Sequence, residues 1–285
     1  MNLKTALLVI SFVCAMDPAY SQEFRSEKLR FDLSQEYKSN DIPSPMERLV
    51  EESVFYGLII GVDNYIDPAI NSLNNAIKDA EAVRDLLISE YRFEKQNIQF
   101  LKDPKRDDII IALDYLSRRV GPKDNLIIFY AGHGLWDANA NIGFWLPTDA
   151  RKISSAAWFR NSTLVDYLKA INSRHTLLIT DACFSGSIFK TRKAFDDAPK
   201  DIALLYEYPS RKAMTSGSLT EVPDQSSFTR YFLERLEKNP QRYLSAEQLF
   251  SSMRSAVINN SDAIPQYGEI KNVGDQGGDF IFIRK

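Results

Sequence analysis

The chain has 285 residues, of which 44% are hydrophobic and 26% charged, a composition that suits a globular protein with one sizeable core or at most two domains. Its formal net charge is −3 and no basic run is dense enough for nucleic acid, so nucleic-acid binding is not expected. No internal repeat and no low-complexity tract occurs in the sequence.

The first 21 residues have the pattern of a secretory signal peptide. Lys4 supplies the positive charge, residues 6–16 form the apolar run, and Ala19 and Ser21 make the small-residue cleavage signal. The apolar run is too short to span a bilayer, so a stable membrane anchor is not expected. We therefore expect cleavage near Ser21 and a secreted or periplasmic protein.

Cysteine usage singles out one thiol. Of the two cysteines, Cys14 lies in the predicted signal peptide, so the processed chain keeps only Cys183 and cannot form an intramolecular disulfide. A lone thiol in an exported protein calls for an explanation.

After the signal peptide, residues 22–52 are polar, mixed in charge and rich in proline near their end, which predicts an arm outside the core. Residues 53–285 are expected to form one domain, in which short apolar runs alternate with helical spacing. Strands are predicted at 54–62, 97–101, 125–130, 143–147, 175–180, 212–216 and 278–285. Helices are predicted at 71–91, from Asp107, from a capping box of Thr163 with Asp166, at 228–236, and from Ser245 with Gln248 to Val257.

This alternation predicts an α/β fold, a three-layer sandwich with a mainly parallel sheet and helices on both faces. Residues 190–208 are charged and aperiodic, and we expect them to form an exposed loop. For the last strand, with its apolar run 280–283, two placements stay open: inside the sheet, or paired with a second copy of the chain.

Two strands lead into residues with catalytic chemistry. Sites in such sheets form beyond the carboxyl ends of the strands, where strand 125–130 runs into His133 and the strand from His175 runs into Cys183. At about 3.3 Å per residue, His175 lies roughly 26 Å from Cys183, so we interpret it as structural. His133 is thus the histidine able to serve the thiol.

A cysteine attacks as its thiolate, and a neighbouring imidazole both favours that form and later protonates the leaving amine. The backbone N–H groups of Gly134 and Cys183 are candidates for the oxyanion hole, because glycine lets the chain approach a substrate closely. The alternative is a buried structural cysteine with a hydrogen-bonded structural histidine.

The two motifs resemble those of a known family. YAGHG followed by DACFSGS, with His133 and Cys183 separated by 50 positions, resembles the caspase-like cysteine peptidases (family C14, with a caspase p20-type domain), above all the bacterial caspase homologues and metacaspases. The likeness extends over residues 54–285 and includes LIIGVDNY, LPTDA and TSGSLTEVPDQSSF. It implies the caspase–haemoglobinase fold with a six-stranded sheet, endopeptidase activity on peptides or proteins, a His133/Cys183 dyad and an oxyanion hole at Gly134 and Cys183.

One departure from true caspases bears on specificity. Caspases have glutamine two positions before the nucleophile, whereas this chain has Asp181, which points to the same side of the strand as residue 183. In metacaspases an acid at this position holds Arg or Lys, and Asp224 and Asp79 resemble further pocket positions. We therefore expect cleavage after Arg or Lys. The alternative role of Asp181 is to bind the N–H groups of its loop.

Regulation is open on the sequence. Residues 190–208 contain lysines and arginines at the position where family members separate their subunits, so the segment is either a self-cleavage site or a solvated loop. No cofactor is required by the sequence, and calcium activation through Asp63 and Asp67 stays a hypothesis.

Two competing functions remain. One is a catalytically silent caspase-fold protein that binds peptides or partners, and the other is a cysteine hydrolase or transpeptidase on a different α/β fold. The glycine-flanked nucleophile elbow typical of the latter is absent around Cys183.

Overall fold

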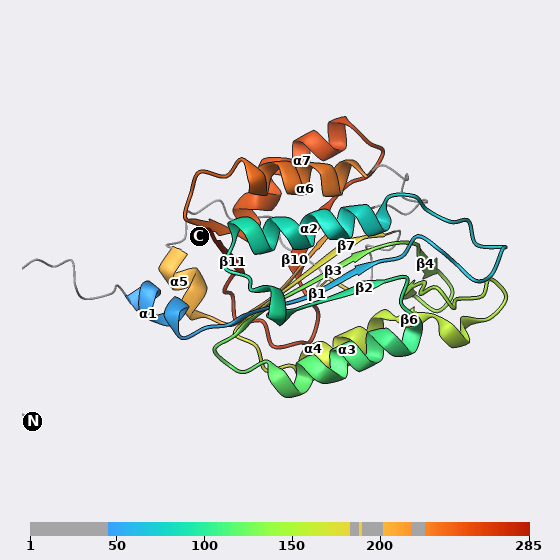
Figure 1. Cartoon of the computed structure of the whole chain (residues 1–285), viewed down its shortest axis with the longest axis horizontal. Helices are drawn as coiled ribbons and strands as arrows, with labels where there is room; N and C mark the ends of the chain where they lie inside the picture. Colours follow the sequence, from blue (N-terminus) through green and yellow to red (C-terminus); the bar gives the residue numbers. More distant parts are fainter. Residues whose placement is uncertain (1–44, 183–187, 190–201, 218–225) are drawn as a thin grey trace, which may run out of the picture. The chain divides into compact units, whose positions relative to one another are not determined.

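The computed structural model describes residues 45–182, 188–189, 202–217 and 226–285. Its centre is a six-stranded sheet with the order β10-β8-β7-β3-β1-β2, in which β10 is antiparallel to β8 and the other pairs are parallel (Figure 1). This confirms the predicted α/β class and the mainly parallel sheet.

The central strands coincide with the apolar runs of the sequence. β1, β3 and β7 are buried at every residue, because a parallel sheet carries helices on both of its faces. Side chains alternate between these faces, so Ile59 and Phe129 pack into one core and Leu58 and Ile128 into the other. The strands are β1 (Phe55–Gly61), β2 (Ile98–Lys102), β3 (Asn125–Ala131), β7 (His175–Asp181), β8 (Ser210–Thr215) and β10 (Gln266–Glu269).

Two helical layers enclose the sheet (Figure 1). One layer contains α2 (Ala76–Glu90), α6 (Ser227–Glu237) and α7 (Ala246–Asn259), and the other contains α3 (Arg106–Arg119) and α4 (Asn161–Ala170). α7 begins with the predicted capping box: the Gln248 N–H donates to the Ser245 hydroxyl at 3.1 Å, and the Ser245 N–H donates to the Gln248 side chain at 3.2 Å.

Two small sheets lie outside the central one. The first contains β4 (Gly134–Asp137), β5 (Ile142–Trp145) and β6 (Phe159–Arg160), and the second pairs β9 (Tyr243–Ser245) with β11 (Ile281–Ile283) antiparallel. The last strand therefore pairs within the chain but outside the central sheet, which neither of the two expected placements anticipated. Short 3-10 helices cover Lys95–Asn97 and Ser155–Ala157.

The predicted boundaries of the arm and of the exposed loop differ from the structure. Part of the 22–52 arm forms α1 (Pro45–Glu51), whose Val50 is buried in the core. The end of the 190–208 loop forms α5 (Ile202–Glu207), where Tyr206 is fully buried. Residues 190–201, with the proposed cleavage positions, lie outside the described part of the chain.

Two helix starts also differ from prediction. α4 begins at Asn161 directly after β6, so Thr163 lies inside the helix and the capping box predicted there is wrong. α2 begins at Ala76 and not at residue 71, because Asp63 accepts the Ala76 N–H at 2.8 Å and the Ile77 N–H at 3.3 Å. None of the helices in the described segments has both the length and the apolar character needed to cross a bilayer.

Candidate active site

His133 lies just beyond the carboxyl end of β3, where the chain turns into β4. The turn depends on Gly132, whose φ of 156° is unfavourable for other residues and whose missing Cβ leaves room for the Tyr130 hydroxyl. A Cβ at position 132 would stand 2.9 Å from that oxygen and 3.2 Å from the Val62 Cβ. The glycine before the histidine is therefore fixed by packing.

Three groups hold His133. Its ring Nε2 lies 2.8 Å from the carbonyl oxygen of Asn71, and its backbone N–H donates to the Tyr65 hydroxyl at 2.9 Å. Its own carbonyl accepts the Tyr130 hydroxyl at 2.7 Å and the Leu146 N–H at 3.0 Å. Because a carbonyl oxygen can only accept, Nε2 carries the hydrogen, and Nδ1 keeps the lone pair that a general base needs.

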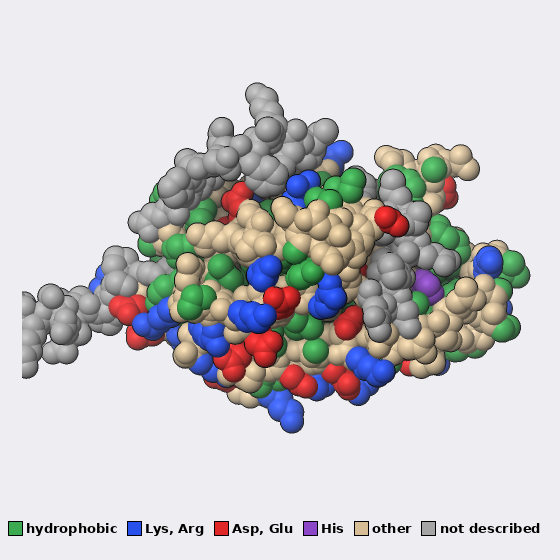
Figure 2. Space-filling model, turned by 90° about the horizontal axis from the view of Figure 1, so that it is seen from above, with side chains coloured by type: hydrophobic (Ala, Val, Ile, Leu, Met, Phe, Trp, Pro, Cys, Tyr) green, Lys and Arg blue, Asp and Glu red, His purple; other side chains and the backbone are tan. Residues whose placement is uncertain are grey.

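The imidazole is also packed against an aromatic ring. The Tyr65 and His133 ring centroids are 5.2 Å apart with a 39° angle between the ring planes. His133 and the following Gly134 are half-buried, and a histidine side chain is visible at the surface in Figure 2. The ring is thus reachable from solvent on a rigid support.

Strand register relates the two predicted dyad positions. β3 and β7 are parallel neighbours in which Ala131 pairs with Asp181. His133 and Cys183 each follow this pair by two residues in the sequence. Cys183 itself, and with it one half of the predicted oxyanion hole, lies outside the described residues.

Asp181 is the last residue of β7 and is 3% exposed. Its Oδ2 accepts the Thr229 hydroxyl of α6 at 2.5 Å, whereas its Oδ1 and the Ser216 hydroxyl are buried without a hydrogen-bond partner within the described residues. Burial raises the pKa of Asp181, and the hydrogen bond from the Thr229 hydroxyl partly opposes this shift. A buried carboxylate oxygen of this kind favours a cationic or N–H-bearing partner.

Of the other two predicted pocket acids, the structure describes Asp79 but not Asp224. Asp79 is half-buried in the first turn of α2, the helix that packs on the sheet face to which Asp181 points. Asp224 lies outside the described residues. Asp79 and Asp181 therefore lie on the same side of the central sheet, and both lie near the carboxyl ends of the strands.

The two acids considered for calcium already bind backbone N–H groups. Asp63 caps α2, and Asp67 accepts the Ala69 N–H at 2.9 Å and the Lys152 N–H at 2.8 Å. Hydrogen bonds from these two N–H groups lower the pKa of Asp67. Within the described segments no group of three or more His, Cys, Asp or Glu side chains is arranged to hold a metal ion. Both acids thus have a structural role in the loop between β1 and α2, and calcium activation through them stays a hypothesis.

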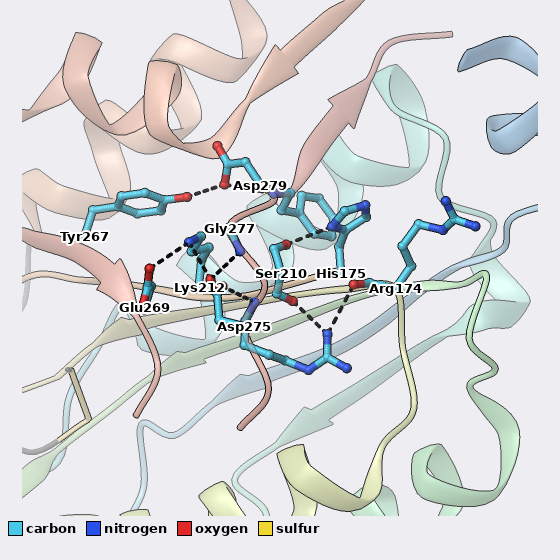
Figure 3. A network of polar contacts seen from close by, with 11 residues as sticks. Arg174, His175, Ser210, Lys212, Tyr267, Glu269, Asp275, Gly277 and Asp279 are labelled. Atoms are coloured by element: carbon cyan, nitrogen blue, oxygen red, sulfur yellow. Dashed lines mark hydrogen bonds and ion pairs between the residues drawn. The ribbon is translucent and has the colours of Figure 1, made fainter. Parts of the chain in front are cut away.

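His175 lies at the opposite end of the sheet, in register with Asn125 at the start of β3. It is completely buried, and its Nδ1 lies 2.8 Å from the Ser210 hydroxyl (Figure 3). Its Nε2 lies 2.9 Å from the Tyr206 carbonyl oxygen. Burial lowers the pKa of His175 to about 3, so the ring is neutral. These contacts confirm its structural role.

Replacing His175 by glutamine is expected to make unfolding less dependent on pH. The folded-state pKa is depressed, so His175 contributes stability that is present above pH 6.5 and lost as the pH falls toward 3. Since a change of one in pKa equals about 1.4 kcal/mol, the loss amounts to at most about 5 kcal/mol. Urea unfolding of wild type and His175→Gln at pH 7 and pH 4.5 measures this, and parallel pH dependences would contradict it.

The same edge of the sheet contains a buried ionic cluster. Lys212 lies 3.1 Å from Asp275 and 3.8 Å from Glu269, while the buried carboxylate of Asp279 accepts the Tyr267 hydroxyl (Figure 3). Burial raises the pKa of Asp279 to about 6. The Lys212–Asp275 pair attaches the loop after β10 to β8, and Asp279 of that loop binds Tyr267 of β10, so the perturbed acid here has a structural explanation.

Sequence reasoning missed the residues that hold His133. Tyr65 is part of LIIGVDNY, but nothing in its pattern indicated a contact with a histidine 68 positions away. Asn71 acts through a backbone carbonyl, which leaves no trace in side-chain type. Thr229 is one hydroxyl within an amphipathic helix, and it becomes significant only through its contact with Asp181.

Known proteins resemble this chain in sequence and in fold. The sequence profile of the caspase domain, Peptidase_C14, matches residues 56–273. Metacaspase-1 of Eremothecium gossypii is 31% identical over 85 residues, which are 27% of this chain and 18% of that protein. Metacaspase-1 of Saccharomyces cerevisiae is 34% identical over 85 residues, again 27% of this chain and 19% of that protein. The matched segment therefore spans about a fifth of each metacaspase.

Solved structures share the fold. Caspase-1 from Spodoptera frugiperda superposes with a TM-score of 0.55 at 12% identity, covering 76% of this chain and 86% of that chain. A protein from Geobacter sulfurreducens gives a TM-score of 0.54 at 16% identity, covering 80% and 99% of the two chains. With the caspase-domain match over more than half of its length, the chain belongs to the caspase-domain family of cysteine peptidases, Peptidase_C14.

Proposed function

We propose that this chain is an exported cysteine endopeptidase that uses His133 and Cys183 and cleaves peptide bonds after Arg or Lys. The observation that carries the proposal is the fixation of His133, whose Nε2–H is committed to the Asn71 carbonyl so that Nδ1 is the basic nitrogen. The register of β3 and β7, with both dyad residues two positions beyond one strand pair, supports the assignment of Cys183 as its partner.

The proposed reaction begins when His133 Nδ1 takes the proton of the Cys183 thiol. The thiolate sulfur then bonds to the carbonyl carbon, and the N–H groups of Gly134 and Cys183 stabilise the resulting oxyanion. The carbon–nitrogen bond breaks, and the amine leaves with the proton that His133 held. A water molecule, deprotonated by the same imidazole, finally hydrolyses the thioester and regenerates the thiol.

The basic specificity rests on Asp181. Its buried Oδ1, without a partner within the described residues, suits the guanidinium or ammonium group of a substrate side chain. Burial without such a cation raises the pKa of Asp181. A bound substrate cation would offset the unfavourable burial of the carboxylate. Asp79 and Asp224 are proposed to contribute further negative charge, and export is proposed from residues 1–21.

Fluorophore release from peptide amides that end in Arg, Lys or Asp tests this function. The chain without residues 1–21 is expected to cleave the Arg and Lys peptides, and Cys183→Ala is expected to abolish the cleavage. Because Asp63 and Asp67 bind backbone N–H groups, we expect the same rates with calcium and with a chelator.

Three results would change the proposal. Activity on the Asp peptide alone would keep the dyad and discard the acidic pocket. Activity that disappears with chelator would show that a metal binds elsewhere. Peptide binding without turnover in every condition would favour the catalytically silent, peptide-binding alternative.

A further inference from the structure

We propose that Tyr65 is a positioning residue that fixes the tautomer and orientation of the His133 imidazole, an inference that rests on the proposed function of His133. The Tyr65 hydroxyl accepts the His133 backbone N–H at 2.9 Å, and the Tyr65 ring packs on the imidazole with centroids 5.2 Å apart. One side chain thus contacts both the backbone and the ring of the proposed base.

The loop that carries Tyr65 also supplies the carbonyl that binds Nε2. Tyr65 and Asn71 both lie between β1 and α2, and their contacts to His133 are 2.9 and 2.8 Å long. A displacement of this loop therefore moves the hydroxyl and the carbonyl together. The orientation of the histidine ring depends on the loop as a unit.

The loop is anchored at both ends and in its middle. Asp63 caps α2 through the Ala76 N–H at 2.8 Å, and its own carbonyl accepts the Leu73 N–H at 2.8 Å. In the middle, the Ile66 N–H donates to the Thr148 carbonyl at 2.8 Å. These contacts hold Tyr65 in place before any substrate binds, which is what a preorganised site requires.

Hydrogen bonds connect the carbonyl of His133 back to its own N–H through the neighbouring chain segments. The Leu146 N–H binds the His133 carbonyl at 3.0 Å, and Thr148 lies two residues after Leu146. The Thr148 carbonyl in turn binds Ile66, which follows Tyr65, and the Tyr65 hydroxyl binds the His133 N–H. The buried Tyr130 further stabilises the His133 backbone, because its hydroxyl donates to the His133 carbonyl at 2.7 Å. Removing the Tyr65 hydroxyl therefore removes the hydrogen bond to the His133 backbone N–H and breaks this chain of contacts.

Histidine-selective ¹⁵N NMR of the full chain tests the role of Tyr65 without requiring turnover. The chain has two histidines, and the buried His175 serves as an internal reference. Wild-type His133 is expected to show a single Nε2–H tautomer at pH 8 and a slowly exchanging backbone N–H. Tyr65→Phe is expected to give a mixture of tautomers and to lower kcat about tenfold, with KM changed less than about twofold, the loss typical of one hydrogen bond.

Tyr115→Phe is the matched control, because Tyr115 is 49% exposed on α3 and takes no part in the contacts of His133 described above. It is expected to leave the tautomer pattern and kcat at wild-type values. A wild-type His133 N–H that exchanges as fast as an unprotected amide would overturn the proposal even if Tyr65→Phe failed to fold. An unchanged tautomer and kcat in a folded Tyr65→Phe would overturn it as well.

The two proposals fail separately. Wild-type protein without turnover but with a tautomer that depends on Tyr65 would remove the peptidase and keep the positioning role. An active wild-type protein whose tautomer and kcat are unchanged in Tyr65→Phe would support the peptidase and exclude the positioning role.

Discussion

Replacing His133 by alanine is expected to lower kcat/KM for the Arg and Lys peptides about 10²–10⁴-fold, the range that general acid–base catalysis supplies. The variant loses the nitrogen that accepts the thiol proton and returns it to the leaving amine. Its fold should persist, since the ring is half-buried and the surrounding hydrogen bonds to its backbone N–H and carbonyl do not involve the side chain. Peptide hydrolysis measures the loss of activity, and circular dichroism measures whether the fold persists.

His175→Gln is the control that the chain itself provides. It removes the other histidine, at the opposite end of β7, and we expect it to retain activity at pH 8 where it remains folded. An active His133→Ala, or an inactive but folded His175→Gln, would contradict the assignment of the base.

The parts of this fold that the sequence predicted are those fixed by short-range pattern. β1, β3 and β7 are apolar runs buried at every residue, and their alternation with helices defines a parallel sheet and the edge where sites form. The positions of His133 and His175 at opposite ends followed from strand length alone. No other information was needed for these points.

The elements that the sequence did not predict are held by distant contacts. Tyr206 of α5 lies in a segment that begins as a charged run, yet its hydroxyl lies 3.0 Å from the Ser53 hydroxyl and accepts the Asn125 amide at 2.9 Å. β10 is four residues long, and its pairing with β8 uses backbone groups that every sequence has. Pattern within a window of residues does not carry such information.

The same limit applies to the candidate site. His133 and Asp181 were identifiable because their residue types carry chemistry and follow strands. The Asn71 carbonyl and the Thr229 hydroxyl act through contacts 62 and 48 residues apart in sequence, which only the folded chain brings together.

Replacing Asp181 by asparagine is expected to lower kcat/KM for Arg and Lys peptides about 10²–10³-fold, the effect of removing one partner of a buried charge pair. Asparagine has nearly the same shape and its amide oxygen can still accept the Thr229 hydroxyl, so the change is mainly one of charge. Asp107→Asn is the control, because Asp107 is 87% exposed on α3, in the opposite helical layer. Equal loss of activity in both variants, or none in Asp181→Asn, would contradict the pocket.

The same substitution is expected to make the fold more stable at pH 8. The folded-state pKa of Asp181 is raised above its ordinary value of 3.8, so the stability associated with that shift is present below pH 3.8 and lost as the pH rises through the folded-state pKa. Asparagine removes the charge that the fold buries unfavourably at high pH. Urea unfolding should therefore show a gain for Asp181→Asn over wild type at pH 8 that shrinks at pH 4. A variant with less activity and more stability at pH 8 would mean that Asp181 is maintained for the substrate at the expense of the fold, whereas a destabilised variant would assign the carboxylate to the structural role of binding its own loop.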